Sequence, residues 1–258
     1  MSIQRTGAAR PAVIIALVML AGGVVSAQRG GGPPRVPPTP KAAAPIDLTG
    51  NWVSVVTEDW RWRMVIPRKG DYSSVPLNAE GRKVADTWDP SKVSRDGCRP
   101  FGAAGVMRVP GRLRISWESD TVLKIETDAG QQTRLLQFDA TQKPATRRTW
   151  QGQSAAEWQR IPQPGGLGVS LATAPGRVGS LKVVTTHLLA GYLRRNGVPY
   201  SEDALVTEYF DRVTAYDNDW LVVLTVVDDR KYLDQPFLTS THFKREPDAS
   251  KWTPTPCE

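Results

Sequence analysis

The two histidines are the first candidates for catalysis, because histidine is the side chain that most readily exchanges a proton near neutral pH. His187 ends one predicted strand and His242 lies within the last one, with Tyr192 and Glu208 between them in sequence. A histidine beside a carboxylate or a phenol inside a folded domain can relay a proton. We therefore treat His187, Glu208, His242 and Tyr192 as candidate catalytic residues. The alternative is that each histidine is hydrogen-bonded for structural reasons or faces solvent.

A second group of candidates lies in segment 58–63, which reads Glu-Asp-Trp-Arg-Trp-Arg. In a strand, alternation would place Trp60 and Trp62 on one face and the arginines on the other. Two tryptophans at a cavity mouth could stack on sugar or aromatic rings, with Glu58 or Asp59 fixing a polar group. The alternative is core tryptophans with solvated arginines outside. The candidate ligand-binding residues are Trp60, Trp62, Glu58, Tyr200 and Tyr209.

Familiar catalytic and metal-binding motifs are absent from the sequence. It has no Gly-x-Ser-x-Gly nucleophile elbow, no His-Glu-x-x-His pair and no phosphate-binding loop. Two histidines also exclude a site that needs three imidazole ligands. We expect no metal and no cofactor.

The excess of positive charge does not indicate a nucleic-acid-binding protein. The 258 residues carry 33 Lys and Arg against 26 Asp and Glu, a formal charge of +7. The first 45 residues contain no acid and hold five of the cations, namely Arg5, Arg10, Arg29, Arg35 and Lys41. Removing these leaves 28 cations against 26 anions, or +2, with no basic stripe to neutralise phosphates. Nucleic acid is therefore excluded as a partner.

Hydrophobic residues make up 40% of the chain, which is enough for a packed core.

The N-terminus predicts export. Two arginines precede an apolar stretch that closes on Val25-Ser26-Ala27, the order found in a secretory signal peptide. The stretch is too short to span a membrane, so we expect cleavage near Ala27 and no membrane span in the mature chain. Residues 28–45 are rich in proline and glycine and read as a linker. The expected organisation is signal peptide 1–27, linker 28–45 and one domain 46–258, located in the periplasm or secreted.

The two cysteines, Cys98 and Cys257, lie in loop-like surroundings without a neighbouring histidine. In an oxidising compartment two lone thiols usually pair. We expect a structural disulfide between them, with a reactive thiol as the alternative.

The elements that position these residues are mostly strands. Short polar or glycine breaks separate segments of alternating or β-branched residues, as in an antiparallel meander. Residues 78–86 could form a short helix capped by Asn78. Eight to ten strands without long helices favour a closed barrel or a sandwich. The predicted strands are 113–118, 122–128, 133–138, 181–187, 205–213, 220–228 and 238–244.

The start of the domain, Asp47-Leu48-Thr49-Gly50-Asn51-Trp52, resembles the opening strand of lipocalin-like (calycin-type) β-barrels, whose signature is Gly-x-Trp. Thr207-Glu208-Tyr209 is similar to the second motif of that family, although here it falls inside a predicted strand. The resemblance implies an antiparallel 8–10-stranded barrel with long loops. It also implies that Trp52 closes one end beneath Lys244 or Arg245. Because the strands of a meander deliver alternate loops to alternate ends, we expect loops 60–76 and 190–200 at the other end.

Two further resemblances add less. Segments 181–186, 197–201 and 206–212 are similar to secreted bacterial proteins of unassigned function, which supports export and a β fold. Nitrobindin-like barrels also open with Gly-x-Trp, and that resemblance implies haem bound by His242 as a weaker option.

Two classes of function follow. The first is a secreted or periplasmic barrel that binds a small apolar or aromatic molecule. The alternative is a cofactor-independent enzyme, an isomerase, lyase or hydrolase, that uses a His, Glu or Tyr acid-base pair in the barrel. In either class the expected partner is a small-molecule ligand or substrate.

Overall fold

The computed structural model describes residues 37–95, 97–139, 145–160 and 179–257 of the chain. The chain divides into two compact units, Met1–Pro37 and Pro38–Glu258, and every strand and helix named below belongs to the second unit. The predicted signal peptide, and the predicted linker as far as residue 36, lie outside the described residues. Among the described residues no helix is long and apolar enough to cross a membrane.

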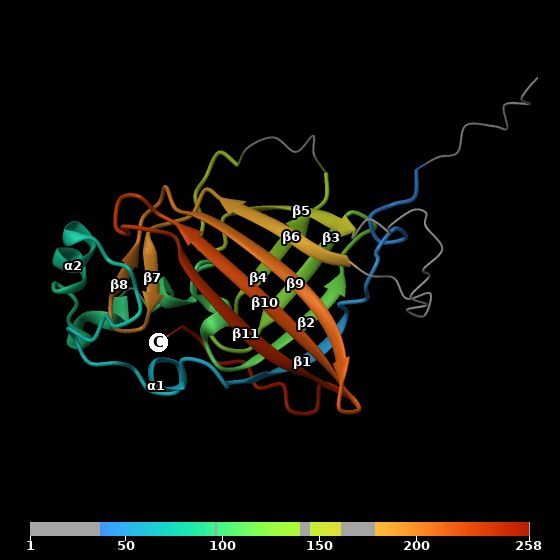
Figure 1. The fold of residues 1–258 in the computed structure, drawn as a ribbon, viewed down its shortest axis with the longest axis horizontal. Coiled ribbons are helices and arrows are strands. Elements are labelled where there is room, and N and C mark those ends of the chain that lie inside the picture. The colour runs from blue at the N-terminus through green and yellow to red at the C-terminus, as the bar shows by residue number, and fades with distance from the viewer. Residues whose placement is uncertain (1–36, 96, 140–144, 161–178, 258) are drawn as a thin grey trace, which may run out of the picture. The chain divides into compact units, whose positions relative to one another are not determined.

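Nine of the described strands close into a β-barrel (Figure 1). Around the barrel the order is β1-β11-β10-β9-β6-β5-β4-β3-β2. The predicted mostly-β barrel is confirmed. The strands are β1 (Gly50–Val55), β2 (Arg112–Trp117), β3 (Val122–Thr127), β4 (Thr133–Gln137), β5 (Gln153–Arg160), β6 (Gly179–Thr186), β9 (Leu205–Ala215), β10 (Asn218–Asp228) and β11 (Phe237–Glu246).

One pair of neighbours, β4 and β5, is parallel, whereas all other neighbours in the barrel are antiparallel. A parallel pair needs a connection that crosses from one end of the barrel to the other. The connection from β4 to β5 is residues 138–152, of which 140–144 lie outside the described residues. The barrel is therefore mixed rather than purely antiparallel, and β5 is a strand that the sequence analysis did not include.

Alternating side chains form the wall of the barrel. On β10, Leu221, Val223 and Val227 are at most 1% exposed and face the interior, while the residues between them are less buried. On β9 the interior residues are Val206, Glu208 and Phe210. Side chains of a strand alternate between the two faces, so Thr207 and Tyr209 face outward.

Trp52 closes one end of the barrel. The indole is fully buried, and its Nε1 donates a hydrogen bond of 3.0 Å to the carbonyl of Leu48. The guanidinium carbon of Arg245 lies 5.5 Å from the ring centroid. Gly50 has φ +129°, and a Cβ atom there would lie 3.1 Å from Nη2 of Arg245. A side chain at Gly50 would therefore strain the backbone and push against that guanidinium. Arg245 rather than Lys244 covers the tryptophan.

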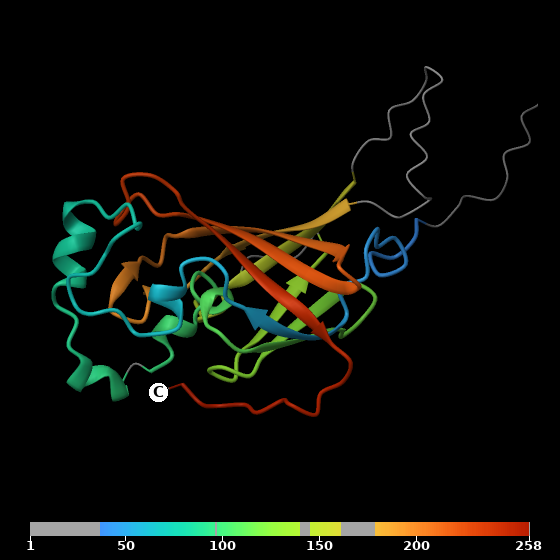
Figure 2. The same cartoon turned by 60° about the horizontal axis from the view of Figure 1, so that its bottom comes forward.

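The opposite end of the barrel is covered by two long connections, which we call the cap (Figure 2). Residues 56–111, between β1 and β2, carry α1 (Trp60–Arg63), α2 (Ala79–Ala85) and the 3₁₀ turns η1 (Pro90–Arg95), η2 (Arg99–Phe101) and η3 (Val106–Arg108). Residues 187–204, between β6 and β9, carry the hairpin of β7 (Gly191–Arg194) and β8 (Val198–Tyr200). Asn196 joins the two connections by donating to the carbonyls of Arg68 and Asp71 at 3.1 and 3.0 Å.

Local sequence explains the two helices of the cap. Asn78 caps α2 through a 2.8 Å hydrogen bond from the amide of Gly81 to its side chain, as predicted for residues 78–86. Segment 58–63, in contrast, is not the alternating strand that we expected. Asp59 adopts a left-handed conformation, φ 52°, and starts one helical turn. Trp60 is consequently 65% exposed, whereas Trp62 packs against the cap.

The predicted disulfide between Cys98 and Cys257 is confirmed, with Cα atoms 4.9 Å apart. After β11 the chain returns to the cap. On the way Trp252 lies beneath Arg114, with 4.3 Å between the guanidinium carbon and the ring centroid, and the amide of Thr255 donates to the carbonyl of Asp128 at 2.9 Å. The disulfide thus fixes the end of the chain to the cap.

Candidate functional site

Three buried arginines meet in the cap. Arg63 comes from α1, Arg108 from η3 and Arg194 from the end of β7, and they are only 6%, 6% and 4% exposed. A buried guanidinium is costly unless it is paired. The partners of these arginines therefore determine what the cluster can bind.

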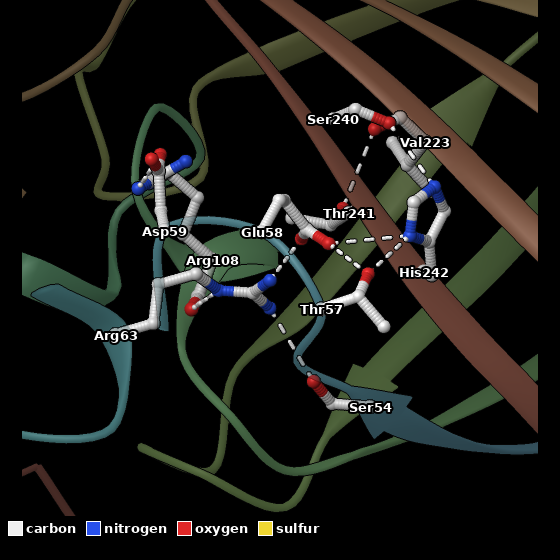
Figure 3. A network of polar contacts seen from close by, with 10 residues as sticks. All are labelled: Ser54, Thr57, Glu58, Asp59, Arg63, Arg108, Val223, Ser240, Thr241 and His242. Carbon is white, nitrogen blue, oxygen red and sulfur yellow. Dashed lines mark hydrogen bonds and ion pairs between the residues drawn. The ribbon is translucent and has the colours of Figure 1, made fainter. Parts of the chain in front are cut away.

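Two of the three arginines have a carboxylate partner (Figure 3). Arg63 pairs with Glu58, and Nη2 of Arg108 lies 2.8 Å from Oδ2 of Asp59. The left-handed backbone at Asp59 lets these consecutive carboxylates reach different arginines. Arg63 also donates to the carbonyl of Arg108 at 2.9 Å and to Oγ of Ser54 at 3.3 Å. Glu58 and Asp59 therefore hold two guanidinium groups in fixed positions.

Arg194 has no carboxylate within ion-pair distance among the described residues. It donates to the carbonyl of Ser73 at 2.7 Å and to Oγ of Ser74 at 2.8 Å, and its guanidinium lies 4.8 Å from the ring centroid of Trp62. Burial, and secondarily the charge of Arg108, lowers the pKa of Arg194 to about 10. It is therefore still positively charged at neutral pH. Nε of Arg194 and Nη1 of Arg108 are buried donors that have no hydrogen-bond partner among the described residues.

A small pocket of about 20 Å³ lies among these side chains. This volume is enough for about one water-sized group. The pocket could therefore hold one oxygen-containing group at the end of a ligand. The rest of the ligand would lie outside the pocket, over its rim. The lining residues are Trp62, Arg63, Pro100, Gly105, Arg108, Val109, Pro110, Leu193, Arg194 and Arg195.

A second polar group continues the network over the barrel rim to the outer face of β11 (Figure 3). His242 Nδ1 lies 3.2 Å from Oε2 of Glu58 and 3.1 Å from Oγ1 of Thr57. Its Nε2 lies 3.4 Å from Oγ of Ser240, two residues earlier on the same face of the strand. The order hydroxyl, imidazole and carboxylate is the one that activates a serine nucleophile. Because His242 is on the outer face, a haem inside the barrel would not reach it.

Glu208 lies inside the barrel and is fully buried with Arg134. The two side chains form a bidentate ion pair, with Nη1 of Arg134 2.9 Å from Oε1 of Glu208. Thr185 and Ser154 complete a polar layer, joined by a 2.8 Å hydrogen bond between their hydroxyls. Side chains with no exposed area border no water-sized space. In this structure Glu208 therefore contacts other side chains and lines no open cavity.

The remaining candidates are spread over the molecule. His187 lines a separate surface pocket of about 220 Å³ with Arg148, whose charge is matched by Glu202 and Asp203. Tyr192 contacts Arg99, with 3.3 Å between its hydroxyl and Nη1 of the arginine. Burial raises the pKa of Tyr200, which is completely buried. Trp60 points outward, like Tyr209. The structure therefore brings together Glu58, Trp62 and His242, but not His187, Glu208 or Tyr192.

The arginines of the pocket are the functional candidates that the sequence analysis missed. Arg63 belongs to segment 58–63, whose arginines the alternative interpretation placed in solvent. Arg194 ends β7, where the candidate residue was Tyr192. One signal was available, since Trp-Arg-Trp-Arg next to Glu-Asp is rich in groups that form buried ion pairs. Nothing in the sequence pairs these segments with each other.

No cluster of three or more potential metal ligands occurs among the residues that the structure describes. Comparison of the chain with protein-family models, curated proteins and solved structures finds no match. The site must therefore be interpreted from its own geometry.

Proposed function

We propose that this protein is an exported binding protein whose barrel supports a pocket in the cap for a small anionic ligand with an apolar or aromatic body. The N-terminal sequence and the disulfide support export, because disulfides persist in oxidising compartments. The observation that carries the binding proposal is Arg194, a buried cation without a carboxylate partner beside a pocket.

The chemistry of the pocket favours a carboxylate. Arg108 and Arg194 both line the pocket, and each keeps one buried nitrogen without a partner among the described residues. A carboxylate that enters the pocket could accept from these guanidinium groups once their side chains shift toward it. Charge-assisted hydrogen bonds of this kind are stronger than neutral ones. Trp62, which lies under Arg194, would offer its ring to an apolar or aromatic body at the rim. Benzoate has both features and is a suitable probe.

We expect benzoate to bind and benzyl alcohol, its neutral analogue, to bind much more weakly in isothermal titration. Arg194→Met keeps the bulk of the side chain and removes the donors, so benzoate affinity should fall by about 1.5 to 3 kcal/mol, roughly 10- to 100-fold. Arg82→Met, on the exposed face of α2, is the matched control and should leave the affinity unchanged. Equal affinity for the acid and the alcohol, or unchanged affinity in Arg194→Met, would contradict the proposal.

A second candidate function, ester hydrolysis, rests on a specific observation at the rim. Oγ of Ser240 lies 3.4 Å from Nε2 of His242, and Oε2 of Glu58 lies 3.2 Å from Nδ1 of the same ring. In the reaction, Oγ attacks the acyl carbon and its proton passes to Nε2 of His242, which returns the proton to the leaving alcohol. Water then hydrolyses the acyl-serine. Glu58 would orient the ring through Nδ1.

For this second function we expect a fluorophosphonate to label Ser240 and p-nitrophenyl acetate to be hydrolysed faster than by buffer. Ser240→Ala should abolish both the label and the added hydrolysis. Ser116→Ala, an exposed serine on β2, should change neither. Labelling that persists in Ser240→Ala, or no labelling of the wild type, would rule out a nucleophilic serine here.

A further inference from the structure

The cap carries a run of exposed apolar side chains on and after α1. Trp60, Met64, Val65 and Ile66 are 65%, 60%, 67% and 46% exposed. Single exposed apolar residues are ordinary, but four within seven consecutive positions are more than a scattered surface residue and favour an interaction surface. We call Trp60, Arg61, Met64, Val65, Ile66, Arg68 and Lys69 the α1 patch. Figure 1 shows α1 on the outside of the cap, away from the barrel wall.

The backbone beneath the patch is held in place, so the exposed residues are not a loose loop end. Arg63 and Pro67, which stand on either side of the exposed Met64-Val65-Ile66, are buried. Asn196 binds the carbonyl of Arg68, and Arg63 is anchored to Glu58 and to the carbonyl of Arg108. The fold therefore presents the apolar side chains outward on a fixed support.

The charged residues within the patch are all basic. Arg61, Arg68 and Lys69 are exposed, and segment 60–70 contains no acid. Arg61 pairs with Asp71 at 3.1 Å, whereas Arg68 and Lys69 form no ion pair with any carboxylate that the structure describes. Tryptophan and aliphatic side chains flanked by free cations match the interface of an anionic bilayer, where the apolar groups enter the acyl boundary and the cations meet phosphates.

We propose that the α1 patch docks the protein on the surface of an anionic lipid membrane. Met64, Val65 and Ile66 insert below the headgroups, Trp60 lies at headgroup level, and Arg68 and Lys69 bind lipid phosphates. This contact is peripheral and uses no membrane-spanning segment. The proposal is independent of the ligand pocket, because none of the inserted side chains lines it.

The test is sedimentation of the protein as isolated after export, with vesicles of phosphatidylglycerol and phosphatidylcholine, and with vesicles of phosphatidylcholine alone. We expect binding to the anionic vesicles, weakened by salt. The double variant Val65→Ser/Ile66→Ser and the double variant Arg68→Gln/Lys69→Gln should each lower the partition coefficient at least tenfold. Leu238→Ser on β11, an equally exposed leucine at 61%, is the matched control and should have no effect.

A second measurement locates the contact on the chain. Lipids with brominated acyl chains quench tryptophans that touch the bilayer, and this quenching should fall in Trp60→Phe. Residues 1–36 contain no tryptophan, so insertion of that segment cannot produce the signal. The proposal is overturned if wild-type protein ignores anionic vesicles at low salt, or if Leu238→Ser weakens binding as much as the patch variants. It is also overturned if Val65→Ser/Ile66→Ser only dissociates a dimer in gel filtration, which would assign the patch to a second copy of the chain.

Discussion

Replacing Arg134 with methionine should lower the free energy of unfolding by about 3 to 5 kcal/mol, because it leaves the carboxylate of Glu208 buried without a partner. Both side chains are completely buried in the barrel, and they pair with each other through two hydrogen bonds. An isolated charge in such surroundings cannot be solvated. Urea denaturation followed by circular dichroism measures the loss.

The double variant Arg134→Met/Glu208→Leu is the control for this expectation. Removing both charges together leaves an apolar pair of similar volume, and such replacements are often neutral or stabilising. The double variant should therefore be clearly more stable than either single variant. If Arg134→Met, Glu208→Leu and the double variant all lose the same stability, an unpaired buried charge is not the cause of the loss. Glu208→Gln should be destabilising for the same reason, since it leaves Arg134 charged and half-partnered.

The ion pair between Arg134 and Glu208 could be predicted only in part from the sequence. Alternation on β9 correctly predicts that Glu208 and Asp211 face opposite sides. In Thr133-Arg134-Leu135-Leu136, however, either leucine could face the core, and the polarity of arginine argues for solvent. The structure places Arg134 inside and leaves Leu135 44% exposed, because the carboxylate of Glu208 is available across the barrel. A contact between residues 74 positions apart has no trace in local patterning.

Strand β5 was hidden from sequence analysis for a related reason. Gln153-Ser154-Ala155-Ala156-Glu157 has few β-branched or aromatic residues, which are the usual strand formers. Eight residue pairs with β6 and a short parallel pairing with β4 hold it in the sheet instead. The tertiary environment overrides propensity here, and closure of the barrel depends on it.

The cap was the least predictable part of the fold, although its position was foreseen. A meander delivers alternate loops to one end, so loops 60–76 and 190–200 were expected to meet, and Asn196 joins them. The turn at Asp59 was not foreseen. A non-glycine residue in the left-handed region is uncommon, and here it directly precedes α1, in which Arg63 is buried.

Replacing Trp52 with alanine should lower the free energy of unfolding by about 3 to 5 kcal/mol, the range found when large buried aromatics are truncated. The indole is fully buried against the apolar core that includes Leu113, Ile115 and Phe243, and the cavity left behind would open beside Arg245. Its hydrogen bond to the carbonyl of Leu48 would also be lost. Thermal and urea unfolding measure the effect, and the fold should be retained in circular dichroism.

Two variants separate the contributions at this end of the barrel. Trp52→Phe keeps most of the packing and loses the hydrogen bond to Leu48, so it should cost about 1 kcal/mol plus a smaller packing loss. Arg245→Met removes the cation above the ring, which at a partly exposed site is worth about 0.5 to 1 kcal/mol. The order of stability should therefore be wild type, then Arg245→Met, then Trp52→Phe, then Trp52→Ala. A loss in Arg245→Met as large as in Trp52→Ala would mean that the cation, rather than the buried indole, closes this end of the barrel.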